Sequence, residues 1–239
     1  MIFRSNLAAP DLSPAFAPRT VCKPRHNSFG HDVLSDPEQP CEPGFMTHDE
    51  AAILFNVARE IGGRWFDVGS ACGWGAAHLL AAGCDTMLVD PIYKQASLFQ
   101  RVEENLAWWK KPKWGALSWD SSELWSEMDK GVAFNGATYF DGFVIDGDHT
   151  HPNPLNDAKH AAIHLKDRGV IVLHDCYGDP LRGVEWLMDN GFNARLYWTP
   201  NVLAVCWRGE FTPPDHIHDP SVEQAWRPHF ANFPLARLV

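Results

Sequence analysis

The sequence lacks several features that would assign it to other classes of protein. No apolar run in its 239 residues approaches the length of about 20 residues that a helix needs to cross a bilayer. The first fifteen residues contain an arginine and an aspartate but no apolar run long enough for the core of a signal peptide. We therefore expect a cytoplasmic protein without a role in membranes.

Basic residues and paired cysteines are also scarce. The 20 lysines and arginines are outnumbered by 30 acidic residues, and the net charge of −10 would repel a polyanion. No dense basic stripe offsets this charge locally, so nucleic acid is not expected as a partner. The six cysteines form no CxxC pair and no zinc-finger spacing, which favours scattered reduced thiols.

Proline is unevenly distributed along the chain. Of the 18 prolines, seven lie in residues 1–45 and five in residues 209–239, and the long middle holds only six. This pattern predicts irregular arms at 1–46 and 209–239 around one regular domain at 47–208, a division that also suits the chain length.

Short β-rich runs alternate with helical stretches through the middle of the chain. We predict strands at 64–69, 86–90, 114–120, 140–146 and 169–175, and helices at 74–83, 94–110, 121–129, 154–167 and 180–191. This rhythm predicts a mostly parallel sheet with helices on both faces. Two further runs, 194–198 and 202–207, are joined by the turn-forming "TPN" and predict a hairpin that adds one antiparallel strand.

The first predicted strand ends in a turn of small residues, "DVGSACGWG", which begins at Asp67 and contains Gly69, Ser70, Ala71 and Gly73. Small residues permit a tight turn and let a ligand approach the backbone. Sites for nucleotide sugars, nicotinamides and S-adenosylmethionine all begin this way, as do purely structural turns.

Two further acids follow the second and third strands. Asp90 lies 23 residues after Asp67, where a carboxylate can accept hydrogen bonds from ribose hydroxyls, although it could equally cap a turn before Pro91. Asp120 is followed by Ser121 and Glu123, a pattern that suits a helix cap, contact with an adenine edge, or both.

The sequence resembles the class I S-adenosylmethionine-dependent methyltransferases over residues 47–208, through "FDVGSACGWG", "LVDP", "WDSSELW" and "FDGFVIDGDHTHPNPLNDAKHAAIHLKDRGVIVLHD". The last stretch is most similar to the macrocin and mycinamicin O-methyltransferases and the cephalosporin-biosynthesis group. The resemblance implies a Rossmann-like, doubly wound α/β fold whose seven-stranded sheet ends in an antiparallel strand. It also implies a divalent cation near strands 4 and 5. The cofactor residues implied are Asp67, Gly69, Ser70, Ala71, Gly73, Asp90, Asp120, Ser121 and Asp146.

The sequence departs from the family pattern at two positions. Ala71 replaces a common glycine, which is tolerable if its φ is negative, and His151 replaces a common tyrosine.

Asp146 and Asp175 end two strands that should be neighbours, about 5 Å apart. Because two carboxylates at this spacing repel each other, we predict a shared cation such as Mg²⁺ or Mn²⁺, with His174 as a third ligand. In the alternative, Asp146 contacts the cofactor and His174 is structural. We predict His149, on the loop after Asp146, as the base that removes the acceptor's proton, with Asp146 as the acceptor's anchor. His151 is the alternative base, and a histidine in a loop can also be simply exposed.

Together these residues predict an O-methyltransferase that acts on a hydroxyl of a small molecule, a sugar or natural-product intermediate. A nicotinamide-dependent oxidoreductase is disfavoured, because the turn is not Gly-x-Gly-x-x-Gly and no Tyr-x-x-x-Lys pair follows. A cofactor-binding module without turnover is the other alternative. The sequence leaves open the acceptor, the presence and identity of the metal, the role of the arms and the oligomeric state, with a homo-oligomer as one possibility.

Overall fold

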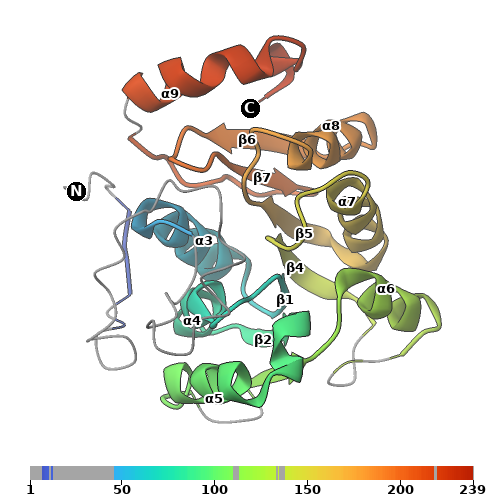
Figure 1. The fold of residues 1–239 in the computed structure, drawn as a ribbon. Coiled ribbons are helices and arrows are strands. Elements are labelled where there is room, and N and C mark those ends of the chain that lie inside the picture. The colour runs from blue at the N-terminus through green and yellow to red at the C-terminus, as the bar shows by residue number, and fades with distance from the viewer. Residues whose placement is uncertain are drawn as a thin grey trace.

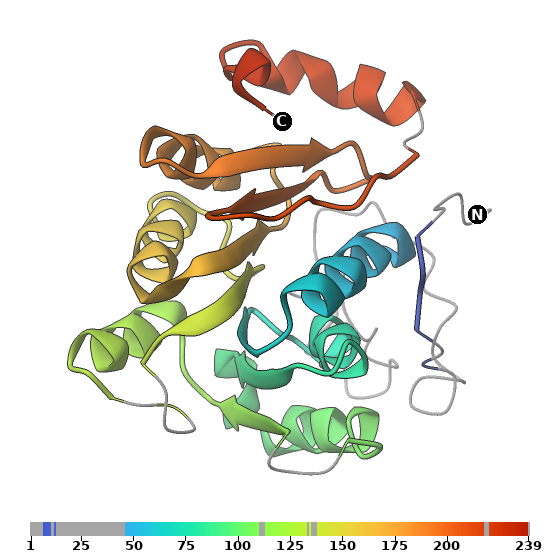
Figure 2. The ribbon, with the colours of Figure 1, turned by 180° about the vertical axis from the view of Figure 1, so that it is seen from behind.

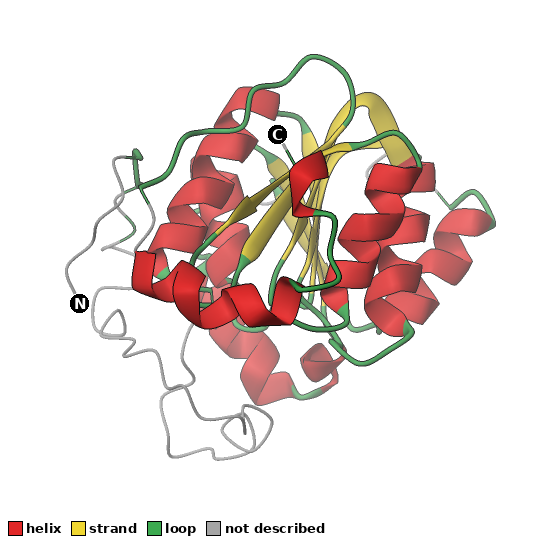
Figure 3. Ribbon diagram, turned by 90° about the horizontal axis from the view of Figure 1, so that it is seen from above, coloured by secondary structure: helices red, strands yellow, loops and turns green. Residues whose placement is uncertain are grey.

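The computed structural model describes residues 7–10, 12, 46–109, 113–132, 134, 138–217 and 220–238. The predicted N-terminal arm lies almost entirely outside these residues. The described chain folds around one central sheet with helices on both of its faces (Figure 3).

Seven strands form the sheet, and they agree with the predicted positions to within a few residues. Their bounds are β1 Arg64–Val68, β2 Asp85–Val89, β3 Trp114–Leu117, β4 Phe140–Ile145, β5 Leu165–Leu173, β6 Asn193–Tyr197 and β7 Leu203–Trp207. The α-helices described are α3 His48–Ile61, α4 Trp74–Ala81, α5 Ala96–Asn105, α6 Ser121–Asp129, α7 Asn153–His164, α8 Pro180–Asp189 and α9 Pro220–Trp226. Short 3₁₀ helices are η1 Pro91–Lys94, η2 Arg227–Phe230 and η3 Leu235–Arg237.

The strand order is β3-β2-β1-β4-β5-β7-β6. Strands β1 to β5 pair in parallel, and β7 is antiparallel to both β5 and β6. The predicted fold class, with an antiparallel final strand, is therefore confirmed, and this strand, β7, lies between β5 and β6. The chain crosses from the β3 edge back to the far side of β1, which makes the carboxyl ends of β1 and β4 the switch point of the sheet, where such folds bind ligands.

Two apolar layers hold the helices to the sheet. One cluster joins α3, α4 and α5 to one face, and a second joins α6, α7 and α8 to the other. Figures 1 and 2 show this arrangement from opposite sides, with α9 beyond β6 at the end of the sheet where the chain finishes. No helix in the described part of the chain has the length and apolar character needed to cross a membrane.

The structure corrects the prediction for residues 154–167. The helix ends at His164 and the strand begins at Leu165, because Leu165 pairs with Phe140 ahead of a register shift in β4 and β5. The guanidinium of Arg208 donates to the backbone oxygens of Ala162 and Leu165, at 2.7 and 3.1 Å, and so satisfies carbonyls where the helix stops.

The C-terminal arm is also more regular than predicted. Helix α9 and the two 3₁₀ helices after it occupy much of residues 220–237. Phe230 is buried against Trp198, and the indole N–H of Trp226 donates to the backbone oxygen of Pro200 at 3.1 Å. Aromatic side chains therefore attach this segment to the second apolar cluster, despite its prolines.

Candidate active site at the carboxyl ends of the strands

The turn after β1 lies directly against the end of β4. Gly69 has a φ of 84°, and a side-chain carbon at this position would lie 2.2 Å from the backbone oxygen of Asp146. Only glycine satisfies both the left-handed conformation and this close approach. The glycine therefore brings the two strand ends together. Gly73, with a φ of 91°, begins α4 four residues later.

Ala71 adopts a left-handed conformation with a φ of 43°, so the condition of a negative φ is not met. Its backbone is held at both ends, because its N–H donates to Asp90 Oδ2 at 2.9 Å and its carbonyl accepts from the Tyr93 hydroxyl at 3.0 Å. The same hydroxyl lies 2.6 Å from Ser70 Oγ. These contacts stabilise a conformation that an alanine rarely adopts.

Asp67 is the acid of β1, and its carboxylate is buried with few hydrogen-bond donors around it. It is 2% exposed and accepts a hydrogen bond from the backbone N–H of Ala76, but its Oδ2 has no hydrogen-bond partner among the described residues. Burial raises the pKa of Asp67, and the charges of Asp146 and Asp90 raise it further, to about 8. A cation placed beside this carboxylate would be strongly favoured.

Asp90 and Asp120 both act as caps. Asp90 Oδ1 accepts from the backbone N–H of Ile92 at 3.0 Å, at the start of η1. Asp120 Oδ1 accepts from the backbone N–H of Glu123 at 2.9 Å. The Glu123 carboxylate in turn accepts from the backbone N–H of Asp120. Ser121 is the first residue of the helix that follows. The capping alternatives are thus present at both positions.

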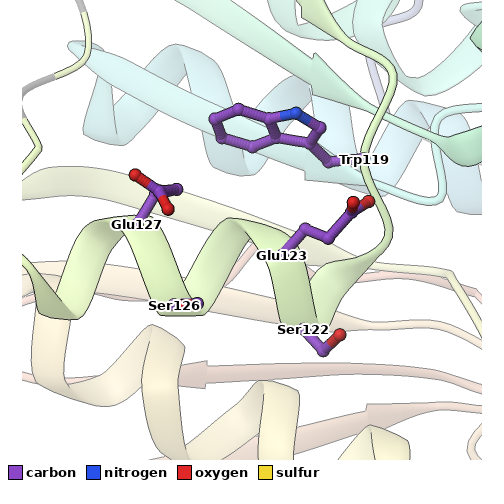
Figure 4. Close-up of a pocket in the computed structure, with 5 residues that line it drawn as sticks. All are labelled: Trp119, Ser122, Glu123, Ser126 and Glu127. Atoms are coloured by element: carbon purple, nitrogen blue, oxygen red, sulfur yellow. The ribbon is translucent and has the colours of Figure 1, made fainter.

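An open cavity of about 390 Å³ lies beside Asp120, on the outer side of α6. Trp119 and Glu123 border it with Ser122, Ser126 and Glu127 (Figure 4). The residues that line the cavity come directly after β3 in the chain, and β3 is three positions from β4 in the sheet. The cavity is therefore not the space above the Asp146 cluster.

Asp146, His149 and Asp175 meet at the ends of the neighbouring strands β4 and β5. His149 Nδ1 lies 3.0 Å from Asp175 Oδ2, and His149 Nε2 lies 3.4 Å from Asp146 Oδ1. One potential ligand atom from each residue lies within 4.8 Å of the others. The adjacency expected for the two carboxylates is therefore present, and we call these three residues the carboxylate–histidine cluster.

His174 differs from its expected place as a metal ligand. It is fully buried, with Nδ1 lying 2.8 Å from Asp146 Oδ1 and Nε2 lying 3.1 Å from Glu50 Oε2. Both ring nitrogens are thus engaged by carboxylates, and His149 takes the third position in the group able to hold a cation. His151, the alternative base, is exposed, and its backbone N–H donates to Asp179.

The charges of the cluster are strongly coupled. Burial alone lowers the pKa of His149, but its hydrogen bonds to Asp146 and Asp175 raise it to about 10. Burial opposes ionisation of Asp175, yet the charge of His174 and the hydrogen bond to His149 hold its pKa below its ordinary value. The pKa of Asp146 is lowered for the same reasons. Without a further cation, the cluster therefore holds a proton on His149.

Three residues that contact this cluster or its neighbours were not predicted. Glu50 and Asn201 lie outside the motifs, although the spacing of Thr47 and Glu50 is a capping-box pattern that could have indicated the start of α3. Tyr177 donates a hydrogen bond to Asp175 and stacks on Trp226, with ring centroids 4.3 Å apart. No sequence signal links Trp226 to this loop.

Comparison with known proteins agrees with the fold. Residues 66–176 match a family model described as a methyltransferase domain. No curated protein matches the chain. Several solved structures share the fold at low sequence identity. The O-methyltransferase TomG of Streptomyces achromogenes, involved in tomaymycin synthesis and solved with S-adenosylmethionine, is 13% identical with a TM-score of 0.57, over 85% of this chain and 92% of its own.

Two other neighbours illustrate the breadth of the fold. Cofactor-bound Rv0187 from MTB is 15% identical with a TM-score of 0.58, over 83% of this chain and 91% of its own. The precorrin-6y C5,15-methyltransferase of Geobacter metallireducens is 14% identical with a TM-score of 0.52, over 68% of this chain and 89% of its own. At these identities the likeness concerns the fold, and it does not specify an acceptor.

The matched segment runs from β1 to the residue after Asp175 and so contains both the glycine turn and the carboxylate–histidine cluster. Fold and match together define a methyltransferase domain. This match supports an enzyme that transfers methyl groups.

Proposed function

We propose that the protein is an O-methyltransferase that transfers a methyl group from S-adenosylmethionine to a hydroxyl of a small molecule, such as a sugar or natural-product intermediate. The observation that carries this proposal is the carboxylate–histidine cluster, which lies at the switch point beside the glycine turn. The resemblance of residues 140–175 to the macrocin and mycinamicin group supports oxygen as the acceptor atom. A cytoplasmic location and a homo-oligomer stay predictions.

The residues of the glycine turn fit the methyl donor. S-adenosylmethionine carries an ammonium group and a sulfonium, and Asp67 offers a buried carboxylate oxygen without a partner in the described structure. We assign the methionine part of the cofactor to the turn of Asp67, Gly69, Ser70, Ala71 and Gly73. Asp90, Asp120 and Ser121 would border its adenosine part, and Asp146 its reactive end.

We further propose that the cluster binds a divalent cation, Mg²⁺ or Mn²⁺, through the carboxylates of Asp146 and Asp175, with the imidazole of His149 beside it as the base. Carboxylate oxygens suit both ions. When bound, the cation would supply positive charge that lowers the pKa of an acceptor hydroxyl. His174 and His149 hold the pKa values of both aspartates below the ordinary value despite burial, so both carboxylates are ionised and able to bind a cation.

The reaction requires the acceptor oxygen to lose its proton as it attacks the methyl carbon of the sulfonium. We assign this proton to His149 Nε2. The other ring nitrogen, Nδ1, is held by Asp175 at 3.0 Å, whereas Nε2 lies farther from its nearest carboxylate oxygen, Asp146 Oδ1, at 3.4 Å. Asp175 thereby orients the ring and fixes which nitrogen is the acceptor. Asp146 anchors the acceptor beside it.

We place the acceptor on the side of the cluster bordered by Tyr177 and Trp226. This aromatic pair adjoins Asp175 through the Tyr177 hydroxyl, and Trp226 belongs to the C-terminal arm. Stacked rings suit the apolar face of a sugar or of a planar natural product. The arm at 209–239 would then contribute to acceptor selection. Trp226→Ala should raise the KM for the acceptor with little change in affinity for S-adenosylmethionine, and an unchanged KM would remove the arm from this role.

Binding measurements on the full chain test the proposal. Titration calorimetry should detect S-adenosylmethionine and S-adenosylhomocysteine but not NAD, and should detect Mn²⁺ only when Asp146 and Asp175 are intact. NAD binding alone would favour the oxidoreductase alternative. Binding without product formation from a panel of hydroxylated acceptors would favour a module without turnover. Failure of the metal titration, together with activity that resists a chelator, would remove the cation and leave the rest.

A further inference from the structure

Helix α3 contributes a buried acid to the site from outside the matched domain. Glu50 lies in the first turn of α3 and is fully buried, although a carboxylate at this place in a capping box is usually near the surface. The family match begins at residue 66, so the matched domain does not account for this residue.

The carboxylate of Glu50 is surrounded by hydrogen-bond donors. Oε1 accepts from the backbone N–H of Asn201 at 2.9 Å. Oε2 accepts from the backbone N–H of Thr47 at 2.7 Å, and lies 3.1 Å from His174 Nε2 and 3.2 Å from the side-chain nitrogen of Asn201. Helix capping needs only the Thr47 contact. The other three donors come from the β5 end and the turn between β6 and β7, so they tie α3 to the strands that carry the cluster.

His174 continues this chain of contacts to Asp146. Its Nε2 faces Glu50, and its Nδ1 lies 2.8 Å from Asp146 Oδ1. A ring held at both nitrogens cannot rotate without breaking a buried hydrogen bond, which is costly. One oxygen of Asp146 is therefore fixed by a ring that is itself fixed by a residue 124 positions away in the sequence.

We propose that Glu50, supported by Asn201, is a positioning residue that acts through His174 to set the orientation of Asp146. This inference rests on the proposed function, since it gives the contact chain a role in the carboxylate–histidine cluster. Glu50 touches neither of the two acids nor His149 in that cluster, so any effect of its replacement on the cluster must pass through His174. Residues that orient metal ligands in this way typically change metal affinity by about 10- to 100-fold when they are replaced.

The experiment compares Glu50→Gln with Thr47→Ala in the full chain. An amide cannot accept at both ends, so Glu50→Gln leaves part of the contact chain unpaired, whereas Thr47→Ala removes the Thr47 side-chain bond to the backbone N–H of Glu50 and does not touch His174. We expect Glu50→Gln to weaken Mn²⁺ binding by about tenfold or more. Thr47→Ala should bind Mn²⁺ like the wild type, and both variants should keep the wild-type affinity for S-adenosylmethionine.

Ring ¹⁵N spectra of the histidines give a second readout that does not need a metal. Glu50→Gln should shift the signals of both His174 and His149, because the effect is transmitted through Asp146. If the wild type binds no Mn²⁺, the cation proposal fails and the positioning inference is decided by His149. A shifted His149 signal supports it, and an unchanged signal overturns it. If the wild type does bind Mn²⁺, the positioning inference is overturned when Glu50→Gln leaves both the Mn²⁺ affinity and the His149 signal unchanged.

Should Glu50→Gln fail to fold, Asn201→Ala provides a milder test. It removes the side-chain donor to Glu50 but leaves the backbone donor and the carboxylate in place. We expect the same directions with smaller size, a loss of Mn²⁺ affinity of roughly threefold and a smaller shift of His149. Wild-type values in this variant would then overturn the inference.

Discussion

Replacing Asp67 with asparagine should stabilise the cofactor-free protein at pH 8 and weaken its binding of S-adenosylmethionine. The carboxyl group is 2% exposed, and its Oδ2 has no hydrogen-bond partner within the described ranges. An asparagine has nearly the same shape but carries no charge. The substitution therefore removes a buried charge while changing the packing little.

The direction follows from the pKa of the folded state. Burial, together with the charges of Asp146 and Asp90, raises the pKa of Asp67 from 3.8 to about 8. The folded protein thus holds this proton more tightly than the unfolded chain does. The stability contributed by the protonated carboxyl group is complete below pH 3.8 and is lost as the pH rises through about 8.

The size of the effect has a clear upper limit. A shift of this size corresponds to about 6 kcal/mol if the surroundings do not adjust. Rearrangement of nearby groups and entry of water reduce this value, and we expect a gain of about 2 kcal/mol for the asparagine variant at pH 8. The gain should become small near pH 4, where the wild-type carboxyl group is protonated in the folded state and about half protonated in the unfolded chain.

Urea unfolding at pH 4, 6 and 8, followed by circular dichroism, measures this gain, and calorimetry at pH 8 measures cofactor affinity. Asp85→Asn is the matched control, because Asp85 is a partly exposed carboxylate paired with Lys113 at 2.8 Å. A stability difference between Asp67→Asn and the wild type that does not vary with pH would refute the electrostatic reasoning. Undiminished affinity for S-adenosylmethionine would refute the assignment of Asp67 to the cofactor.

Two further substitutions test the geometry and the chemistry of the site. In urea unfolding, Gly69→Ala should lower the free energy of unfolding by more than about 2 kcal/mol beyond the loss caused by Gly83→Ala. Both glycines are left-handed, but only a side-chain carbon at Gly69 would collide with backbone atoms. Equal losses in the two variants would contradict this reasoning. His149→Ala should lower turnover by about a hundredfold in a methyl-transfer assay and leave calorimetric affinity for S-adenosylmethionine nearly intact, so a fully active variant would reject His149 as the base.

The sheet was predictable because each strand carries its own local signal. An apolar run that ends in an acid, as at Asp67, Asp90 and Asp146, is typical of a buried parallel strand followed by a ligand loop. The pairing of Asp146 with Asp175 followed from the adjacency of their strands. Both inferences depend only on residues close in sequence and on the regular order of the fold.

The contacts that cross the sequence could not be predicted in the same way. His174 resembled a metal ligand because it stands beside Asp175, and its actual partner, Glu50, lies 124 residues earlier. The left-handed conformation of Ala71 depends on two hydrogen bonds of its backbone, in which its N–H donates to Asp90 and its carbonyl accepts from Tyr93. Tertiary contacts of this kind override local preference, and a single sequence does not display them.

The acids at the switch point explain why a cationic donor and a cation suit the same site. Glu50, Asp67, Asp90, Asp146 and Asp175 supply five carboxylates, while His149 and His174 supply at most two positive charges. The folded site is therefore negative even with both rings protonated. Burial is the main reason for the raised pKa of Asp67, and this excess of acids adds to it, because Asp146 and Asp90 both oppose its ionisation. S-adenosylmethionine carries a net charge of about +1 at neutral pH and a divalent cation adds two more, so each ligand reduces the repulsion among these acids and favours ionisation of Asp67. Each ligand alone leaves part of the repulsion in place, which is a physical reason for one enzyme to bind both.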